Sequence, residues 1–147
     1  MTGVVAVYGT LRQGGRLHHH LGVHEGRARP VGRALLVGDL YEVGPERRDT
    51  DIEMPYPCYY EGGDGRVVVE LYDVVDQSLW TDLDELEGFL PHDLASSEYH
   101  RRLVALHDAV TDDAHAGITA AWAYVYVRSA PDPARHIASG DWISATR

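Results

Sequence analysis

The chain of 147 residues contains no lysine and no asparagine, and all 13 of its basic residues are arginines. Without lysine the protein cannot form the lysine Schiff base on which pyridoxal phosphate chemistry depends. A nucleotide-binding loop of the Walker A type is excluded as well, because that loop needs its lysine. The loss of both residue types also suggests a coding sequence rich in G and C, which concerns the source and not the function.

Other scarcities restrict the compartment and the partners. Cys58 is the only cysteine, so no internal disulfide can form, which agrees with a reducing compartment. No apolar run approaches the length of a membrane span, and the N-terminus lacks the charged-then-apolar pattern of a signal peptide. The formal net charge of -10 disfavours nucleic acid and anionic membranes as partners. We therefore expect a soluble cytoplasmic protein without cofactor, either a monomer or a weak homodimer.

The composition that remains is typical of a globular protein, with 44% hydrophobic and 24% charged residues. A chain of this length suits one domain with a sizeable core. We see no internal repeat, no linker and no domain boundary, so we expect residues 1–147 to form a single domain.

The stretch 78–90, SLWTDLDELEGFL, has the pattern of a short amphipathic helix that ends at Gly88. At about 100° per residue, its apolar side chains fall in one arc. The members of this arc are Leu79, Trp80, Leu83, Leu86 and Leu90. Asp82, Asp84 and Glu85 fall outside the arc, where we expect them to face solvent.

Glu87 is different, because it falls inside the apolar arc at the C-terminal end of the predicted helix. Burial and the negative end of the helix dipole both disfavour a charged carboxylate, so we expect a raised pKa for Glu87. A raised pKa is typical of a carboxyl group that transfers protons near neutral pH. The alternative is a last-turn residue that bends out to water, and the helix pattern alone leaves both open.

The run Val4–Val7 predicts a strand that is buried on both faces. It leads into the segment Tyr8-Gly9-Thr10-Leu11, where the glycine allows a sharp turn that presents consecutive N–H groups. Such groups can bind an anion. A plain strand-ending turn is the alternative.

Further strands are predicted from β-branched runs and from alternation. They cover 32–43, as one bent strand or two short ones around Gly38, and then 66–75, 99–107 and 119–127. We expect a loop over 44–64, where Tyr56, Tyr59 and Tyr60 could line a pocket or cover the core, and a polar turn over 108–117. In the last strand Trp122, Tyr124 and Tyr126 share one face, either as core or as a pocket wall.

Five or six strands joined mainly by turns, with one clear helix, disfavour an alternating βαβ sheet. We therefore predict an α+β fold, a small and mainly antiparallel β-barrel with peripheral helices.

Two features remain open at this point. The segment 17–24 holds four of the nine histidines, but no acidic or cysteine partner stands at the spacing of a zinc site. We expect it to form a solvated turn or short helix without metal. Glu70, in the middle of the strand 66–75, is a second carboxylate among apolar neighbours. It is either a rival of Glu87 or a strand residue that faces water.

Six segments of the chain occur in an order that resembles a known family. They read VAVYGTLRQG, ELYDV, LDELEGF, YHRRLV, AYVY and SGDW. Together they resemble the γ-glutamylcyclotransferase-like superfamily, and within it the γ-glutamylamine cyclotransferase and AIG2-like branch. The resemblance covers nearly the whole chain and implies a small β-barrel with a cavity.

The resemblance implies a site as well as a fold. Glu87, the glutamate of LEG, corresponds to the general acid/base of the family. The turn after the first strand would hold the γ-glutamyl head of the substrate through backbone N–H groups, and two tyrosines would lie near the pocket. The binding residues implied in this way are Tyr8, Gly9, Thr10, Leu11, Tyr99 and Tyr124.

The implied activity is the cleavage of a γ-glutamyl amide by its own α-amine, which gives 5-oxoproline and a free amine without metal or nucleotide. Two other classes stay open: a non-catalytic binding module for a small acidic metabolite, and a metal-dependent hydrolase that uses His18–His24. The chain also departs from its relatives, with Leu17-His18 where an Asn-His pair is common and Val69 where glycine is common. These departures concern the substrate more than Glu87.

Overall fold

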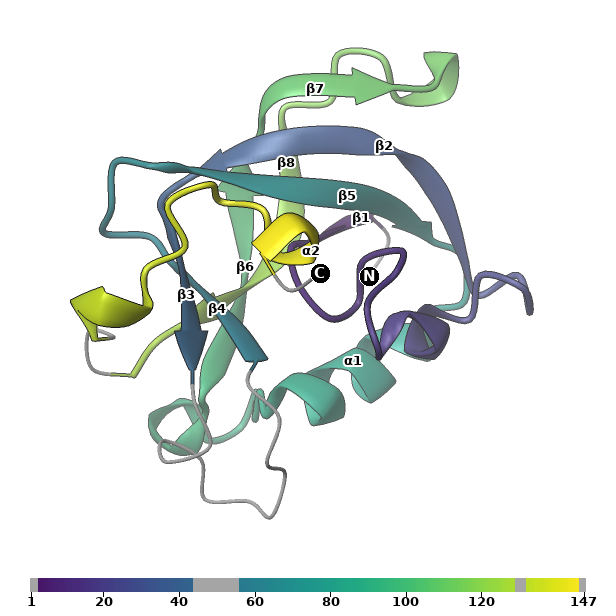
Figure 1. Cartoon of the computed structure of the whole chain (residues 1–147). Helices are drawn as coiled ribbons and strands as arrows, with labels where there is room; N and C mark the ends of the chain where they lie inside the picture. The colour runs from purple at the N-terminus through teal and green to yellow at the C-terminus, as the bar shows by residue number, and fades with distance from the viewer. Residues whose placement is uncertain (1–2, 44–55, 129–131, 146–147) are drawn as a thin grey trace.

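The computed structural model describes residues 3–43, 56–128 and 132–145, and all structural statements below concern these residues (Figure 1). The strands are β1 (Val4–Val7), β2 (Ala28–Val37), β3 (Asp39–Val43), β4 (Tyr56–Tyr60), β5 (Arg66–Val74), β6 (Tyr99–Ala105), β7 (His107–Thr111) and β8 (Ala120–Tyr126). The helices are α1 (Leu79–Glu87) and α2 (Trp142–Ala145), with short 3-10 turns η1 (His18–Leu21), η3 (Leu94–Ser96), η4 (Asp113–His115) and η5 (Pro133–Arg135). None of the helices in the described ranges has the length and apolar character needed to cross a membrane.

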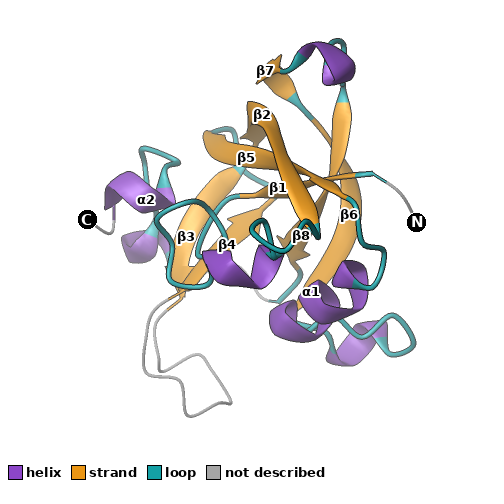
Figure 2. Cartoon of the chain, turned by 90° about the vertical axis from the view of Figure 1, so that its right-hand side faces the viewer, coloured by secondary structure: helices purple, strands orange, loops and turns teal. Residues whose placement is uncertain are grey.

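Six strands form one curled sheet in the order β6-β8-β1-β5-β2-β7, and β3 pairs with β4 in a separate ribbon. All pairs are antiparallel except β1 with β8. Leu106 alone separates β6 from β7, although these strands occupy opposite edges of the sheet. The chain therefore passes directly from one edge to the other, and the sheet curls round as Figures 1 and 2 show. This is the mainly antiparallel, barrel-like α+β architecture that the sequence predicts.

The central strand β1 is buried on both faces, as its sequence predicts. Val4 and Ala6 point into one core cluster, and Val5 and Val7 point into the other. β8 divides in the same way: Ala121 and Ala123 join the first cluster, while the aromatic side chains of this strand join the second. The two clusters therefore lie on opposite faces of the sheet, with β1 and β8 between them.

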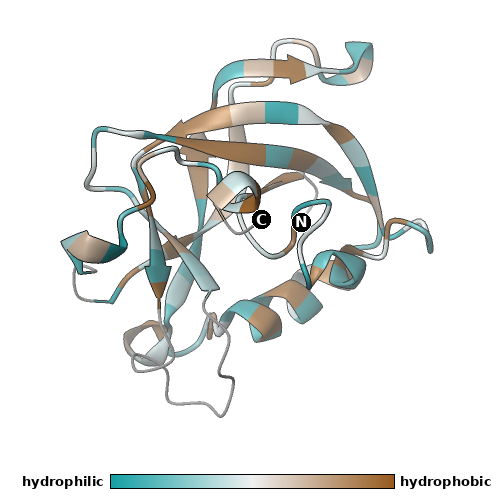
Figure 3. Cartoon of the chain, viewed as in Figure 1, coloured by the Kyte–Doolittle hydropathy of each residue, from teal (hydrophilic) through white to brown (hydrophobic). Residues whose placement is uncertain are grey.

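Helix α1 lies against the second cluster, below the sheet in Figure 1. Leu79, Trp80 and Leu83 are buried, and the amphipathic pattern is visible as alternating bands along the helix in Figure 3. The helix ends at Gly88, which adopts a left-handed φ of 67° as a C-terminal glycine commonly does. The helix prediction is confirmed, except that Leu90 follows the end of the helix and is exposed.

Two strands were not predicted, so the structure has more strands than the five or six expected. β4 lies within the predicted loop 44–64, of which residues 44–55 are outside the described ranges. Because β4 pairs only with β3, the missing N–H of Pro57 is tolerated there. β7 begins at His107, the last residue of the predicted strand 99–107, and continues into the predicted turn 108–117 as far as Thr111. It is exposed along most of its length, so it carries no alternation that could have indicated a separate strand.

The stretch 32–43, predicted as one bent strand or two short ones, forms two strands. β2 begins before the expected start, at Ala28, and Gly38 separates it from β3 with a φ of 145°. A side chain at Gly38 would collide with the ring of Tyr59. The bend therefore depends on glycine at this position.

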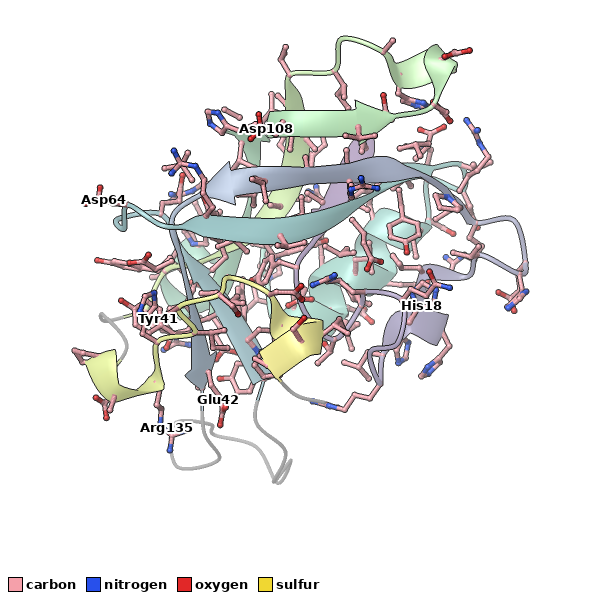
Figure 4. All side chains as sticks on the ribbon, turned by 45° about the horizontal axis from the view of Figure 1, so that its top comes forward. His18, Tyr41, Glu42, Asp64, Asp108 and Arg135 are labelled. Carbon is pink, nitrogen blue, oxygen red and sulfur yellow. The ribbon has the colours of Figure 1, made fainter. Side chains whose placement is uncertain are left out.

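The C-terminal segment crosses β3 and ends beside β5. Ile137 donates its N–H to Leu40 at 2.8 Å, and Arg135 lies 3.5 Å from the carboxylate of Glu42 (Figure 4). Gly140 accepts a hydrogen bond from the N–H of Val68 at 2.8 Å. These contacts bring the SGDW segment next to the turn that follows β1.

Arg12 joins three distant segments there. Its Nε lies 3.0 Å from Glu70 Oε2 on β5, and its Nη1 lies 2.7 Å from Asp141 Oδ1. The other oxygen of Glu70 accepts the N–H of Gln13 and the hydroxyl of Tyr72, each at 2.8 Å. This partly buried carboxylate therefore fixes the turn after β1 to the sheet, a structural role that neither reading of Glu70 predicts.

Replacement of Arg12 by alanine should lower the free energy of unfolding by about 2–3 kcal/mol at pH 7, because two partly buried carboxylates lose their cation. Burial alone would raise the pKa of Asp141, but hydrogen bonds from Arg12 and Ser144 outweigh burial and hold it below its ordinary value. The stabilisation is therefore present at neutral pH and is lost as Asp141 becomes protonated in acid. Urea unfolding at pH 7 and pH 3 should show the difference between wild type and variant shrinking at the lower pH.

The matched control is Arg29→Ala. Arg29 is exposed and lies 3.5–3.6 Å from its two aspartates, so its loss should cost less than about 1 kcal/mol. Equal decreases in the free energy of unfolding for the two arginine variants at pH 7 would contradict the role assigned to Arg12 in holding the turn after β1.

Candidate active site

A cavity of about 140 Å³ opens where β1 ends, between the turn of residues 8–11, the C-terminal end of α1 and the start of β6. All seven residues that the sequence proposes for the site line this cavity. They are Tyr8, Gly9, Thr10, Leu11, Glu87, Tyr99 and Tyr124. The structure brings these residues together from four separate parts of the chain, and the role of each stays a prediction.

The turn after β1 is held tightly against β4. A Cβ at Gly9 would lie 2.0 Å from Cγ of Pro57, so only glycine fits there. The carbonyl of Gly9 accepts the N–H of Arg12 at 3.0 Å, and the carbonyl of Thr10 accepts the N–H of Leu17 at 2.9 Å. Within the described ranges, the N–H groups of Gly9, Thr10 and Leu11 donate to no backbone or side-chain acceptor. The turn can therefore offer donors to an anionic ligand.

Glu87 is the last residue of α1 and is partly buried at the cavity wall. The helix ends directly after it, so the carboxyl group stands at the negative end of the helix dipole. Both conditions for the expected raised pKa of Glu87 are present in the fold, and the raised pKa itself stays a prediction.

The hydroxyl groups of the three tyrosines that the sequence proposes for the site, Tyr8, Tyr99 and Tyr124, already donate within the protein. Tyr8 donates to the carbonyl of Tyr124 at 2.7 Å, and Tyr99 donates to the carbonyl of Pro57 at 2.8 Å. Burial, followed by the nearby charge of Glu87, raises the pKa of Tyr8 well above its ordinary value. Burial is also the main cause of the raised pKa values of Tyr99 and Tyr124. These phenols stay protonated, and their oxygens remain able to accept a hydrogen bond from a ligand.

Asp84 corrects the helical-wheel expectation, because it is buried rather than exposed. Arg101 on β6 donates to both of its oxygens, at 2.7 and 2.9 Å, and the hydroxyl of Tyr124 donates to it at 2.7 Å. The guanidinium also stands over the rings of Trp80 and Phe89, at 4.9 and 5.7 Å from their centroids. Burial raises the pKa of Asp84, although the hydrogen bonds from Tyr124 and Arg101 and the charge of Arg101 act to lower it.

The position of Asp84 could not be seen from the helix pattern alone. A wheel places residues relative to the apolar face of one helix, whereas the partners of Asp84 come from β6 and β8. The available signal was the pairing of an acidic residue in LDELEG with an arginine in YHRR. Asp84 stands one helical turn before Glu87, so this ion pair fixes the end of α1 against the sheet.

Two further residues of the cavity were not proposed as site residues. Glu98, which precedes β6, lines the cavity and accepts a hydrogen bond from the hydroxyl of Tyr56. Tyr56 is buried and lines the cavity, so it belongs both to the core and to the pocket wall. Tyr59 lies in the core, and burial raises its pKa to about 12. A glutamate directly before YHRR was the only available signal for Glu98.

The histidine segment 17–24 forms the short turn η1. His18 places Nδ1 2.8 Å from the carbonyl of Leu11, at the edge of the site turn (Figure 4). The ring centroids of His19 and His20 lie 4.2 Å apart, with the ring planes tilted by 35°. No cluster of three or more potential metal ligands occurs among the residues that the structure describes.

Solved structures with the same fold cover almost all of the chain. An uncharacterized protein, PH0828 from Pyrococcus horikoshii, matches with a TM-score of 0.65 at 22% identity, over 98% of this chain and 92% of its own. An AIG2-like protein from Mus musculus matches with a TM-score of 0.55 at 21% identity, over 91% of this chain and 82% of its own. A structure described as a γ-glutamyl cyclotransferase matches with a TM-score of 0.57 at 15% identity, over 87% of this chain and 68% of its own.

These likenesses place the chain in the class of γ-glutamylcyclotransferase-like folds. The model of the family described as "Gamma-glutamyl cyclotransferase, AIG2-like" matches residues 5–144, and the chain belongs to this family. A search of curated proteins gave no match.

Replacement of Arg101 by methionine should lower the free energy of unfolding by about 3 kcal/mol at pH 7, because Asp84 is left buried without its cation. A raised carboxyl pKa in the folded state means that ionised Asp84 opposes folding, so protonation relieves the cost. Chemical unfolding should therefore show a smaller loss at pH 5 than at pH 7.

The neighbouring variant Arg102→Met is the control. Arg102 and its partner Glu61 are both exposed, so the loss should stay below about 1 kcal/mol at either pH. If Arg101→Met behaved like Arg102→Met, the ion pair would not be what holds α1 in place.

Proposed function

We propose that the protein is a metal-independent γ-glutamyl cyclotransferase that converts a γ-glutamyl amide into 5-oxoproline and a free amine, with Glu87 as general acid/base. One observation supports this proposal above all others. The glutamate at the end of α1 and the donor-rich turn after β1 line the same small cavity. The proposed reaction needs one proton carrier and one group of anion-binding donors, and Glu87 and this turn are the candidates for these two roles.

In the proposed complex, the N–H groups of Gly9, Thr10 and Leu11 bind the α-carboxylate of the γ-glutamyl group. The α-ammonium then faces Glu87 and the tyrosine oxygens of the cavity wall, which accept hydrogen bonds because their own hydrogens are already donated. Binding at both ends bends the glutamyl chain and brings its nitrogen close to the γ-carbonyl carbon.

The chemistry then proceeds by proton transfer without a covalent enzyme intermediate. Glu87 takes a proton from the α-ammonium, and the freed amine attacks the γ-carbonyl carbon to close a five-membered ring. The developing oxyanion is stabilised by backbone N–H groups beside those that bind the α-carboxylate. As the bond to the amide nitrogen breaks, Glu87 returns its proton to that nitrogen. A second proton of the former ammonium follows, so the amine leaves as an ammonium ion.

Replacement of Glu87 by glutamine should lower the rate of 5-oxoproline release from γ-glutamyl amines by about 10²–10⁴-fold, because an amide cannot take up the proton. The measurement is 5-oxoproline formed per enzyme across a panel of γ-glutamyl amines, with folding checked by the unfolding midpoint. Glu85→Gln is the control, since Glu85 is exposed on the same helix and should retain activity. Release by Glu87→Gln at the wild-type rate would exclude the acid/base role.

Activity should also persist after dialysis against a metal chelator, because no step of the proposed reaction uses a metal. Rates before and after dialysis, compared with metal analysis of the purified protein, test this directly. Loss of activity that returns with added metal would favour a hydrolase built on the histidine segment. A protein that binds γ-glutamyl amides but never releases 5-oxoproline would be a binding module.

A further inference from the structure

A second carboxylate lines the cavity, and the proposed reaction gives it no task. Glu98 reaches the cavity from the segment just before β6, whereas Glu87 reaches it from the end of α1. Two carboxylates that share a small cavity influence each other's protonation, because placing two like charges close together costs free energy. The relation between Glu98 and Glu87 therefore bears directly on how Glu87 handles its proton.

The backbone brings the chain segments that carry the two glutamates into contact. The N–H of Glu98 donates to the carbonyl of Gly88, the residue that directly follows Glu87, at 3.2 Å. A Cβ built on Gly88 would lie 3.9 Å from Cβ of Glu98, so the two chain segments are in contact at this point. This contact is part of the helix ending and does not depend on where either side chain points.

The charges of both glutamates affect the pKa values of tyrosines in the cavity. Burial is the main cause of the raised pKa values of Tyr8 and Tyr99, and the charges of Glu87 and Glu98 both add to these increases. Tyr56 donates its hydroxyl hydrogen to Glu98, which fixes that carboxylate at the cavity wall. Both carboxylates therefore influence the same groups in the cavity wall.

We propose that Glu98 is a positioning residue of the reaction, a second carboxylate whose negative charge makes Glu87 hold its proton more strongly. This role rests on the proposed function of Glu87 as general acid/base. A glutamate with an ordinary pKa is a weak partner for an ammonium group, because the proton strongly prefers the amine. A neighbouring negative charge reduces the difference in pKa between the amine and Glu87, so proton transfer from the substrate to Glu87 becomes easier.

Other charged and titratable groups around Glu87 do not replace Glu98 in this role. Tyr8, Tyr99 and Tyr124 carry no charge, because burial raises the pKa of each phenol, and Tyr56 donates its hydroxyl hydrogen to Glu98 itself. Asp84 is bound by Arg101, so its charge is largely compensated. Arg16 lines the cavity from an exposed position, where solvent screens it. Of the described residues that line the cavity, Glu98 alone adds a negative charge beside Glu87.

The test replaces Glu98 by glutamine, which keeps the shape of the side chain and can still accept from Tyr56. Two measurements are made on the full chain. The first is the pH profile of kcat/KM for 5-oxoproline release, whose acid limb reports the ionisation of the free enzyme. The second is a ¹³C NMR titration of the glutamate carboxyl carbons, with the Glu87 signal assigned from its loss in Glu87→Gln.

In Glu98→Gln, the acid limb and the NMR titration of Glu87 should both move to lower pH by about one unit, and the rate at neutral pH should fall. Glu98→Asp keeps the charge and should restore most of the wild-type profile. Glu85→Gln removes a charge from the exposed side of the same helix and should move neither curve. A merely structural role of Glu98 would lower the rate without moving the titration of Glu87.

The outcomes separate this inference from the proposed function. If the wild type releases 5-oxoproline but the titration of Glu87 is the same in wild type and Glu98→Gln, the inference is overturned and the function stands. If the titration moves as expected but no γ-glutamyl amide is converted, the coupling of the two carboxylates is supported and the assigned reaction is overturned.

Discussion

The position of Glu87 depends on a buried ion pair one helical turn earlier, between Asp84 and Arg101. The apolar face of α1 could pack on the sheet at several rotations, because hydrophobic contact has no direction. The ion pair removes that freedom, since a buried carboxylate tolerates only the geometry in which its oxygens are satisfied. The hydroxyl of Tyr124 adds a third hydrogen bond from another strand. Apolar packing therefore brings α1 onto the sheet, and the ion pair sets the rotation of the helix.

A second charge cluster holds the turn after β1, which also lines the cavity. Arg12 holds the turn after β1 against β5 and the C-terminal segment, so the donor groups of the turn keep their direction. The two clusters share one arrangement, an arginine and carboxylates drawn from segments far apart in the chain. Together they use every segment on which the family resemblance depends: YGTLR, ELYDV and SGDW in one, and LDELEG, YHRR and AYVY in the other.

This arrangement explains what the sequence could and could not predict. The strand 4–7, the helix ending at Gly88 and the alternation of 119–127 follow from local periodicity, which one segment carries by itself. Glu87 could be singled out because a charge inside an apolar arc is a local anomaly; it lines the cavity, and its role stays a prediction. Asp84 was not found, because its environment is made by two other strands. β4 was missed because Pro57 argues against a strand. Proline is excluded only from strands that are paired along both edges, and the pairing of a strand depends on the whole fold.

The contact between the segments that carry Glu87 and Glu98 belongs to the same category. It arises where the end of α1 meets the start of β6. The sequence pattern of the helix says nothing about the strand that it meets, and the pattern of the strand says nothing about the helix. Such contacts between element ends are where a fold can place like charges together without disturbing its core, because both side chains project into a cavity instead of into packed apolar groups.

The Arg12 cluster has a consequence for biosynthesis. One of its carboxylates, Asp141, follows Arg12 by 129 residues, while the turn that it braces comes directly after the first strand. On the ribosome, β1 and its turn therefore emerge long before Asp141, and the turn lacks this partner until the segment that follows β8 has been made. Chains released short of this aspartate would contain all six strands of the sheet and still carry a loosely held turn after β1.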